Sequence, residues 1–377
     1  MNTFKVRNGQ KHMGAERRIA LGALLLLTFV LFLSGCGSAG NHTEGEVCVL
    51  VDCLGREVEV PAKIEKIAAI DSFSGEALIM IGAGEKMAAC PNGVKGDKLL
   101  ETIYPELPKV AVVQSEGAIN AEALLELSVD VVLLKNSFYL SEGETAKLDK
   151  LGIPYLVIQY ETMEEQLEAL ALVGQVAGGA AEEKAEALCD YYRNTIDLVR
   201  DRSALIPAEE RLTAYHSISE AVRTDGTDSL GADWISAVGC KNVSVGEPLT
   251  PEGENYYASL EQIFNWNPDV ILCNDKATAE YICSSMKWKG LSAVREGKVY
   301  NIPVGATRWG QQGSVETYFG MLWAGTVLYP EYYGDIDLKT EVKKVYQDIL
   351  GLEVDDALYQ KILSGEGIRQ GSSSSGK

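Results

Sequence analysis

Histidine is scarce in this 377-residue chain, which contains His12, His42 and His216 and no others. The first two precede residue 47, in segments that do not resemble a folded domain. A protein site for a bare transition metal usually brings several histidine or cysteine ligands together. The sequence therefore disfavours a bare-cation site, and we expect any bound metal to be enclosed in an organic chelator.

The common catalytic signatures are also missing. The chain has no GxxxxGK[ST] phosphate loop, no HExxH zinc helix and no GxSxG nucleophile elbow. Gly82 and Gly84 in "IGAGEKM" follow a helical pattern and lack a third glycine, so they are interpreted as a helix C-terminal cap. With His216 as the one histidine of the body, little acid–base machinery remains, and the sequence predicts a protein that is not an enzyme and has no cofactor.

Positive charge is in short supply. Lysine and arginine number 34 against 54 aspartate and glutamate residues, a net charge of −20. Without the first 35 residues, 29 basic and 53 acidic residues remain. Nucleic acid, which is bound chiefly through neutralised phosphates, is therefore excluded as a partner.

The number and spacing of the cysteines do not fit a disulfide framework. Seven cysteines follow Cys36, an odd number with no CxxC pair, which argues against a zinc ribbon as well. Cys48 and Cys53 flank a short stretch, so the sequence leaves open whether they pair. Cys273 ends an apolar strand pattern and is interpreted as a small buried hydrophobe.

The N-terminus has the pattern of a secretory signal. Basic residues precede the uncharged run from Ile19 to Leu33, and small residues follow it. The run has 15 residues, fewer than the roughly 20 that a permanent transmembrane helix needs. "LSGC", ending at Cys36, resembles the bacterial lipobox, in which the cysteine is lipidated and becomes the new N-terminus. We therefore expect a signal peptide over residues 1–35, a lipid on Cys36 that anchors the protein at the outer face of the membrane, and a flexible tether over 36–46.

The remaining length favours two lobes, because one core rarely serves so long a chain. An alternating hairpin pattern around Gly55 is followed by four strand patterns at 66–71, 86–91, 130–136 and 154–160, with helices between them. A helical stretch from 162 to 205 is interrupted at Gly178 and Gly179, where we expect a kink. Four more strand patterns follow at 211–217, 241–246, 269–275 and 298–304, and the segment 285–297 reads as mostly helix.

The predicted fold is α/β, with two Rossmann-like lobes of mainly parallel strands, a joining helical spine and a ligand cleft between the lobes. The lobes are placed at 47–161 and 206–367, and a disordered low-complexity tail at 368–377.

A repeated phrase links the two halves. "NAEALLELSVDVVLL" at 120–134 aligns without gaps with "SLEQIFNWNPDVILC" at 259–273, at an offset of 139 residues. Glu122 matches Glu261, and Asp130 matches Asp269. The two phrases occupy the same place in each half, so duplication of one lobe is the economical explanation.

Candidate cleft residues follow the strands, because ligands bind beyond the carboxyl ends of parallel strands. Arg308 and Trp309 offer the sharpest combination, a guanidinium for an acidic group beside a flat indole for a planar ligand. The predicted cleft residues are Ser72, Phe73, Asn136, Phe138, Tyr139, Tyr160, His216, Asn274, Arg308 and Trp309.

"LSGC", "VDCLGREVEVP", "KIAAID" and the two repeated phrases together resemble a known family. So do "WKGLSAVREGKVYNIP" and "LYPEYYGDIDL" nearer the C-terminus. The resemblance is to the lipoprotein substrate-binding components of ABC importers for iron-siderophores, haem and cobalamin, and it extends from Cys36 to about Gly365.

The resemblance implies a monomeric receptor that closes modestly over an iron- or cobalt-containing chelate. It also implies docking on an ABC permease, with its ATPase, through one glutamate from each lobe; the motif places these at Glu122 and Glu261. Two alternatives stay open at this point. One is a receptor for another metal complex or an oxyanion, which Arg308 would suit, and the other is a two-lobed, chelatase-like enzyme acting on tetrapyrroles.

Overall fold

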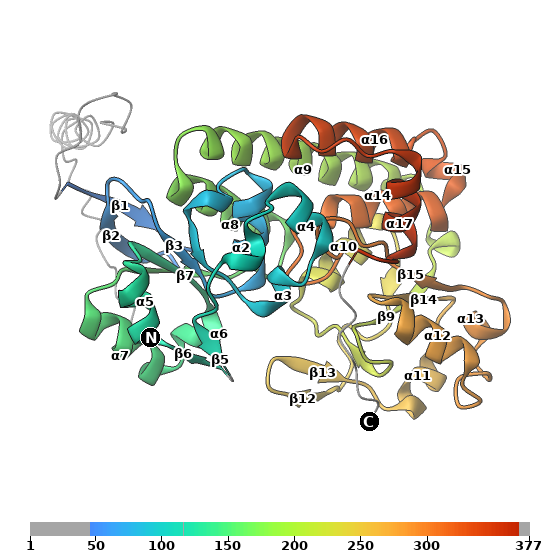
Figure 1. Cartoon of the computed structure of the whole chain (residues 1–377). Coiled ribbons are helices and arrows are strands. Elements are labelled where there is room, and N and C mark those ends of the chain that lie inside the picture. The colour runs from blue at the N-terminus through green and yellow to red at the C-terminus, as the bar shows by residue number, and fades with distance from the viewer. Residues whose placement is uncertain (1–45, 116, 369–377) are drawn as a thin grey trace, which may run out of the picture. The chain divides into compact units, whose positions relative to one another are not determined.

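The computed structural model describes residues 46–115 and 117–368 (Figure 1). The predicted signal peptide, the lipidation site Cys36 and the tether up to residue 45 lie outside the described residues, as does the tail from residue 369. No helix among the described residues is long and apolar enough to cross a membrane.

The N-terminal lobe begins with the predicted hairpin, β1 (Val47–Val51) paired antiparallel with β2 (Glu57–Pro61). Asp52 makes the turn: its carboxylate accepts hydrogen bonds from the backbone N–H groups of Leu54 and Arg56 and from the Arg56 side chain. Gly55 has φ 75°, which glycine adopts without strain. A four-stranded parallel sheet follows, with the strand order β4-β3-β7-β8. Its strands are β3 (Ile67–Ala69), β4 (Met87–Ala89), β7 (Val131–Lys135) and β8 (Tyr155–Ile158).

Helices cover this first sheet, and a small hairpin interrupts their sequence (Figure 1). The helices are α2 (Ser72–Met80), α3 (Asn92–Lys95), α4 (Lys98–Ile103), α5 (Ala121–Leu127), α6 (Asn136–Tyr139) and α7 (Glu142–Leu151). The hairpin joins β5 (Gln114–Ser115) to β6 (Ala118–Ile119).

The C-terminal lobe repeats the same plan. Its parallel sheet has the order β11-β9-β14-β15, formed by β9 (Thr213–Ser217), β11 (Lys241–Asn242), β14 (Val270–Cys273) and β15 (Val299–Asn301). A three-stranded sheet stands beside it, formed by β10 (Arg223–Thr224), β12 (Thr250–Glu252) and β13 (Asn255–Tyr257). The helices of this lobe include α10 (Leu230–Val238), α11 (Leu260–Trp266), α12 (Lys276–Ser284) and α13 (Ser292–Arg295).

The two sheets have the same topology. In each, the second strand along the chain lies at one edge, the first strand lies beside it, and the third and fourth follow. The repeated phrases keep equivalent geometry, because α5 and α11 both end on a left-handed residue other than glycine, Ser128 and Asn267. The matched aspartates both tie the third strand of their sheet to the first strand, which lies beside it: Asp130 accepts from the backbone N–H of Lys66, and Asp269 from that of Thr213. This equivalence supports the predicted duplication.

The predicted helical spine differs from the structure at its middle. Helix α8 (Met163–Ala177) ends at Gly178, and α9 (Ala180–Ala204) runs back against it, so the glycine pair reverses the chain instead of kinking one helix. Both glycines have positive φ, which allows the reversal. The helices touch closely at Gly174, where an added Cβ would lie 2.4 Å from the Cβ of Ala185.

Four further helices complete the second lobe. They are α14 (Thr317–Leu328), α16 (Leu338–Val345), which continues as a π-helical turn to Leu350, and α17 (Asp356–Ser364), with the short α15 (Pro330–Tyr333) between the first two. The expectation that 285–297 is mostly helix is wrong, because only Ser292–Arg295 is helical and the longer α12 lies before it.

Candidate functional site

One large cavity lies between the carboxyl ends of the two parallel sheets, where the strand-end argument placed it. Its volume is about 1260 Å³. Both lobes contribute strand ends and the loops that follow them. The lining residues include 70–73, 76, 91–93, 114–115, 117, 135–138, 158–161, 216, 218, 223–226, 228–229, 254–256, 308 and 310–314, with Asn274 directly after β14.

Aromatic rings form part of the N-terminal wall. Phe73 and Tyr160 pack against each other with ring centroids 4.8 Å apart. Asp71 holds the start of α2 beside them, accepting hydrogen bonds from the backbone N–H and the hydroxyl of Ser74. Burial raises the pKa of Asp71, although the bonds from Ser74 work in the opposite direction. The wall therefore combines apolar surface with a fixed helix N-terminus.

The C-terminal wall contains a buried polar network around His216. Its Nδ1 lies 2.8 Å from Asp225 Oδ2, and its Nε2 lies 2.8 Å from Asn274 Oδ1. Asn242 donates to the same Asp225 oxygen. Burial lowers the pKa of His216, but the charge of Asp225 and the two hydrogen bonds outweigh it, so the pKa lies above its usual value.

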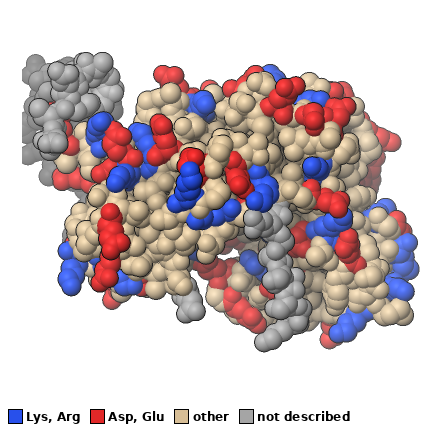
Figure 2. Space-filling model, viewed as in Figure 1, with Lys and Arg blue, Asp and Glu red and all other residues tan. Residues whose placement is uncertain are grey.

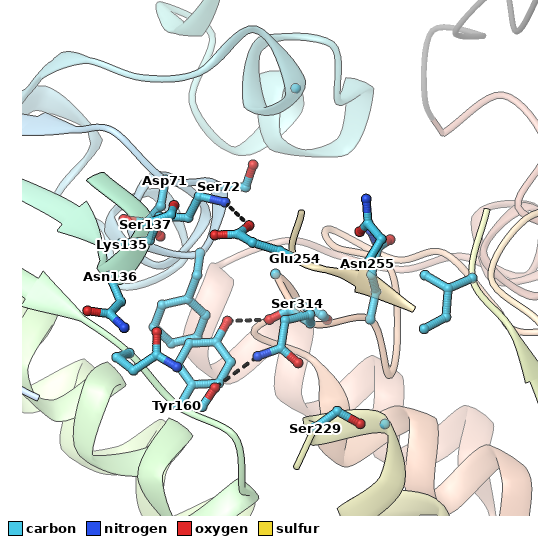
Figure 3. A pocket seen from close by; sticks show the side chains of 18 of the residues that line it. Asp71, Ser72, Lys135, Asn136, Ser137, Tyr160, Ser229, Glu254, Asn255 and Ser314 are labelled. Carbon is cyan, nitrogen blue, oxygen red and sulfur yellow. Dashed lines mark hydrogen bonds and ion pairs between the residues drawn. The ribbon is translucent and has the colours of Figure 1, made fainter. Parts of the chain in front are cut away.

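A rigid loop carries Arg308 to the cavity. Buried Glu316 holds this loop: its Oε2 accepts from the Thr307 backbone N–H at 2.6 Å, and its Oε1 accepts from the Tyr346 hydroxyl at 2.6 Å. Burial raises the pKa of Glu316 to about 7. The next part of the loop joins the lobes, because the Tyr160 hydroxyl donates to the Gln312 carbonyl and the Gln312 side chain donates to the Tyr160 carbonyl (Figure 3).

Two hairpins, one from each lobe, stand at the mouth of the cavity. The turn of β5–β6 lines it through Ser115 and Gly117, and the turn of β12–β13 lines it through Glu254 and Asn255. Each hairpin lies just before one copy of the repeated phrase, so the pair belongs to the duplication.

A salt bridge crosses from one lobe to the other at this mouth. Lys135 Nζ, at the end of β7, lies 2.5 Å from Glu254 Oε2 (Figure 3). Partial burial acts to raise the pKa of Glu254, but its hydrogen bonds to Lys135 and Ser137 hold that pKa below its usual value. The carboxylate is therefore charged at neutral pH, and the pair ties the β12–β13 hairpin to the N-terminal lobe.

Carboxylates outnumber cationic side chains in the lining. Figure 2 shows a hollow between the lobes with acidic side chains beside it. The lining acids are Asp71, Glu76, Glu161, Asp225, Asp228 and Glu254, and the lining bases are Lys135, Arg223 and Arg308. Glu161 and Asp228 repel each other, which together with burial raises the pKa of Glu161.

Eight of the ten predicted cleft residues line the cavity. They are Ser72, Phe73, Asn136, Phe138, Tyr160, His216, Asn274 and Arg308.

The other two predictions are wrong. Trp309 has no exposed surface and packs on Phe319 of α14, with centroids 5.1 Å apart, because the loop turns its indole into the core while Arg308 faces the cavity. Tyr139 is not among the lining residues; the guanidinium of Arg56 stacks on its ring at 4.5 Å.

Sequence reasoning missed Lys135, Asp225, Glu254 and Gln312. Lys135 is the last residue of its strand pattern, one position before the first residue we selected. Glu254 was detectable only by extending the repeat upstream to the hairpin that precedes it. Asp225 and Gln312 lie in irregular loops, for which the sequence offers no periodic signal.

The predicted docking residues lie away from the cavity lining. Glu122 and Glu261 are exposed in the first turns of α5 and α11, and each helix starts on a side-chain cap, Asn120 in one and Ser259 in the other. One turn further on, Leu125 and Phe264 are also exposed, at the same offset of 139 residues. Each lobe therefore presents the same acidic and apolar pair.

Thiols and metal ligands give no separate site. Cys53 is a free thiol, so the disulfide with Cys48 that the sequence left open is not formed. Burial raises the pKa of Cys53 to about 11. Within residues 46–115 and 117–368, no group of three or more histidine, cysteine, aspartate or glutamate residues could hold a metal ion.

Two duplicated α/β lobes around one large cavity define a solute-binding protein, and comparison of the sequence with known families agrees. The periplasmic binding protein family matches residues 67–304, and the chain belongs to this family. Such proteins are binding proteins and not enzymes, and they work with an ABC permease and its ATPase on small-molecule ligands. The chelatase-like enzyme is therefore set aside.

Individual relatives differ in what they are named for. The molybdate-binding protein MolA of Haemophilus influenzae is 24% identical over 322 residues, covering 79% of this chain and 90% of its own length. The probable siderophore-binding lipoprotein YfiY of Bacillus subtilis is 22% identical over 327 residues, covering 78% and 96%. The solved structure of MolA bound to molybdate has a TM-score of 0.72 at 21% identity, covering 82% of this chain and 99% of that one. This structural likeness shows the fold and leaves the ligand open.

Proposed function

We propose that this protein is a lipid-anchored receptor at the outer face of the bacterial membrane, which binds an iron chelate or a corrinoid and delivers it to an ABC permease. The iron chelate would be a siderophore or haem. The size of the cavity carries the proposal. At about 1260 Å³ it exceeds the roughly 300–1,000 Å³ of most organic-ligand pockets. A bare ion would leave nearly all of that space to water, which occupies about 30 Å³ per molecule.

The chemistry of the lining supports an organic ligand. Phe73 and Tyr160 offer flat apolar surface, and Ser72 and Asn136 offer hydrogen-bonding groups beside it. Apolar walls with a few convergent polar groups are typical of sites that hold small organic molecules.

The rival candidate is an oxyanion, for which MolA is named. Three cationic side chains line the cavity, including Arg308, whose planar guanidinium suits an oxyanion. Six carboxylates line the same cavity and oppose an anion, and a small anion would fill little of its volume of about 1260 Å³. We therefore rank the chelate first.

Docking on the permease is proposed for Glu122 and Glu261. Their equivalent, exposed positions on α5 and α11 support a contact made once by each lobe. The neighbouring Leu125 and Phe264 add an apolar component at both points. Attachment to the membrane is proposed for Cys36, on the strength of its lipobox. Cys36→Ala should release the protein from the membrane fraction.

The ligand proposal is tested by the absorbance spectrum and metal content of the full chain purified from rich medium, followed by calorimetric titration. The titrants are a ferric trihydroxamate, haem, cyanocobalamin and molybdate. Asn136→Trp, which fills part of the cavity, should abolish binding, whereas Asn194→Trp on the exposed face of α9 should not. Tight binding of molybdate with no binding of the organic probes would reject the chelate in favour of the oxyanion.

A further inference from the structure

The floor of the cavity contains a buried hydrogen-bond donor without a partner. Asn274 is 2% exposed and lines the cavity. Its Oδ1 faces His216 Nε2, while its Nδ2 makes no hydrogen bond. Leaving a buried amide donor unsatisfied costs roughly 1–3 kcal/mol, so such a group calls for an explanation.

The neighbours of His216 fix one of its nitrogens. Asp225 Oδ2 takes a hydrogen bond from Nδ1, and the Asp225 carboxylate is held from two sides. Asn242 donates to it, and the α10 backbone presses against it: a Cβ added to Gly231 would lie 2.1 Å from Asp225 Oδ1. Nδ1 therefore keeps its proton and its hydrogen bond to Asp225, and His216 gains or loses its second proton at Nε2.

The amide of Asn274 must match whatever Nε2 offers. Protonated His216 donates from Nε2 and requires Oδ1 of Asn274, which leaves Nδ2 without a partner in the cavity wall. Neutral His216, with its proton on Nδ1, accepts at Nε2 and requires Nδ2, which leaves Oδ1 in that place. The two amide orientations occupy the same space, so the side chain can exchange them by a half-turn.

We propose that His216 is a proton-controlled selector, which sets whether Asn274 presents a donor or an acceptor to the ligand. In the protonated state the Asn274 amide donates a hydrogen bond to an acceptor oxygen of the ligand, such as that of a carboxylate, amide carbonyl or hydroxamate. When His216 loses its Nε2 proton, the Asn274 amide turns over and its Oδ1 then faces the acceptor oxygen of the ligand, which is repulsive. This inference deepens the proposed function, because its binding consequence rests on a ligand in this cavity.

The surroundings of His216 favour its protonated state. Asp225 is the charged group in contact with it among the described residues. Trp234 of α10 turns an uncharged ring edge toward it, and Asp275, after β14, is occupied with the N-terminus of α12. Arg223, Arg308 and the carboxylates of the lining border the same cavity.

The sign of the pH effect follows from these contacts. The pKa of His216 lies above its usual value, so the donor state persists to higher pH than in an ordinary histidine and is lost as pH rises through that pKa. Affinity for an acceptor-bearing ligand should then fall by about 3- to 30-fold, the range of one hydrogen bond made or left unmade. Because linkage is reciprocal, binding of such a ligand should raise the pKa of His216 by an amount that corresponds to the same coupling free energy.

The first test needs no ligand. The full chain with His12→Gln and His42→Gln keeps His216 as its one imidazole. Selective ¹⁵N labelling of histidine and asparagine then reports both ring nitrogens and the Asn274 amide by NMR, from about pH 5 upward until His216 has lost its proton. We expect both nitrogens to be protonated at the acidic end, with the Asn274 side-chain amide shifting at the same apparent pKa. A neutral imidazole throughout this range, or an amide that does not respond, overturns the selector.

The second test measures affinity for a ferric trihydroxamate, whose oxygens are acceptors, in the wild type and in Asn274→Asp. The substituted carboxylate keeps an oxygen for His216 but offers the ligand no donor. We expect this variant to bind about 3- to 30-fold more weakly at acidic pH. Asn194→Asp, the same change on exposed α9, should leave binding unaltered. Equal affinity of the Asn274→Asp variant and the wild type would overturn the ligand-reading role, whereas failure of every organic probe to bind would overturn the proposed function instead.

Discussion

The salt bridge between Lys135 and Glu254 should act as a latch on the cavity mouth. It joins the end of β7 in one lobe to the β12–β13 hairpin of the other, at 2.5 Å. The side chains are 44% and 59% exposed, so the pair contributes about 0.2–1 kcal/mol. Because the contact exists only while the lobes are together, removing it should speed ligand release by a factor of about 1.4 to 5.

Stopped-flow displacement of the bound ligand measures this factor. Lys135→Gln and Glu254→Gln should each speed release, and the double variant should add little to either, because both remove one interaction. The charge-swapped pair Lys135→Glu with Glu254→Lys should recover much of the wild-type rate. The effect should shrink in high salt, which screens exposed charges.

A control separates the latch from general charge effects. Lys147→Gln also removes an ion pair, to Glu144 on α7 at 2.8 Å, but it lies outside the cavity lining and should not change release. If Lys135→Gln leaves the release rate at the wild-type value, or if the two single effects simply add, the salt bridge does not hold the lobes together.

Three further predictions concern the helical hairpin, the docking surface and pH. Gly174→Ala should lower the free energy of unfolding in urea by about 1–2 kcal/mol, because the added Cβ would lie 2.4 Å from the Cβ of Ala185. In a helix without that contact the same change would stabilise the protein by about 1 kcal/mol. Adding Ala185→Gly to the variant should relieve the clash. Charge reversal at both Glu122 and Glu261 should abolish transport in cells while leaving ligand affinity unchanged. Glu186→Lys on α9 should leave both transport and affinity unchanged. A large loss of affinity in the Glu122 and Glu261 variant would contradict the docking role. The contribution of buried Glu316 to the free energy of unfolding should fall by roughly 3 kcal/mol as pH rises from about 4.5 to 7, because the unfolded chain releases this proton near pH 4.5 whereas the folded protein, in which the pKa is about 7, keeps it to higher pH; the absence of such a fall would refute this reasoning.

Much of the fold was predictable because the duplicated pattern is strong. The apolar strand patterns and the turn residues between them located the eight strands of the two parallel sheets. The offset of 139 residues between the repeated phrases established that α5 and α11 are equivalent. The reversal at Gly178 was not predictable from periodicity, because a kinked helix and a helical hairpin share the same apolar repeat. What decides between them is the close packing of α8 on α9, a tertiary contact.

The site was predictable where it depends on strand ends and less so where it depends on loops. His216 and Asn274 follow directly from the strands β9 and β14, which carry them to the cavity. Arg308 and Trp309 are neighbours in one loop, yet one faces the cavity and the other the core. Loop conformation, set here by the buried bonds of Glu316, decides that difference, and no local sequence rule reports it.

The central claim is that the cavity holds a large metal chelate. Calorimetric titration of the full chain with a ferric trihydroxamate, haem and cyanocobalamin, beside molybdate, tests it most directly. We expect one-to-one binding of at least one organic chelate, lost in Asn136→Trp. Tight binding of molybdate with no response to any chelate would contradict it.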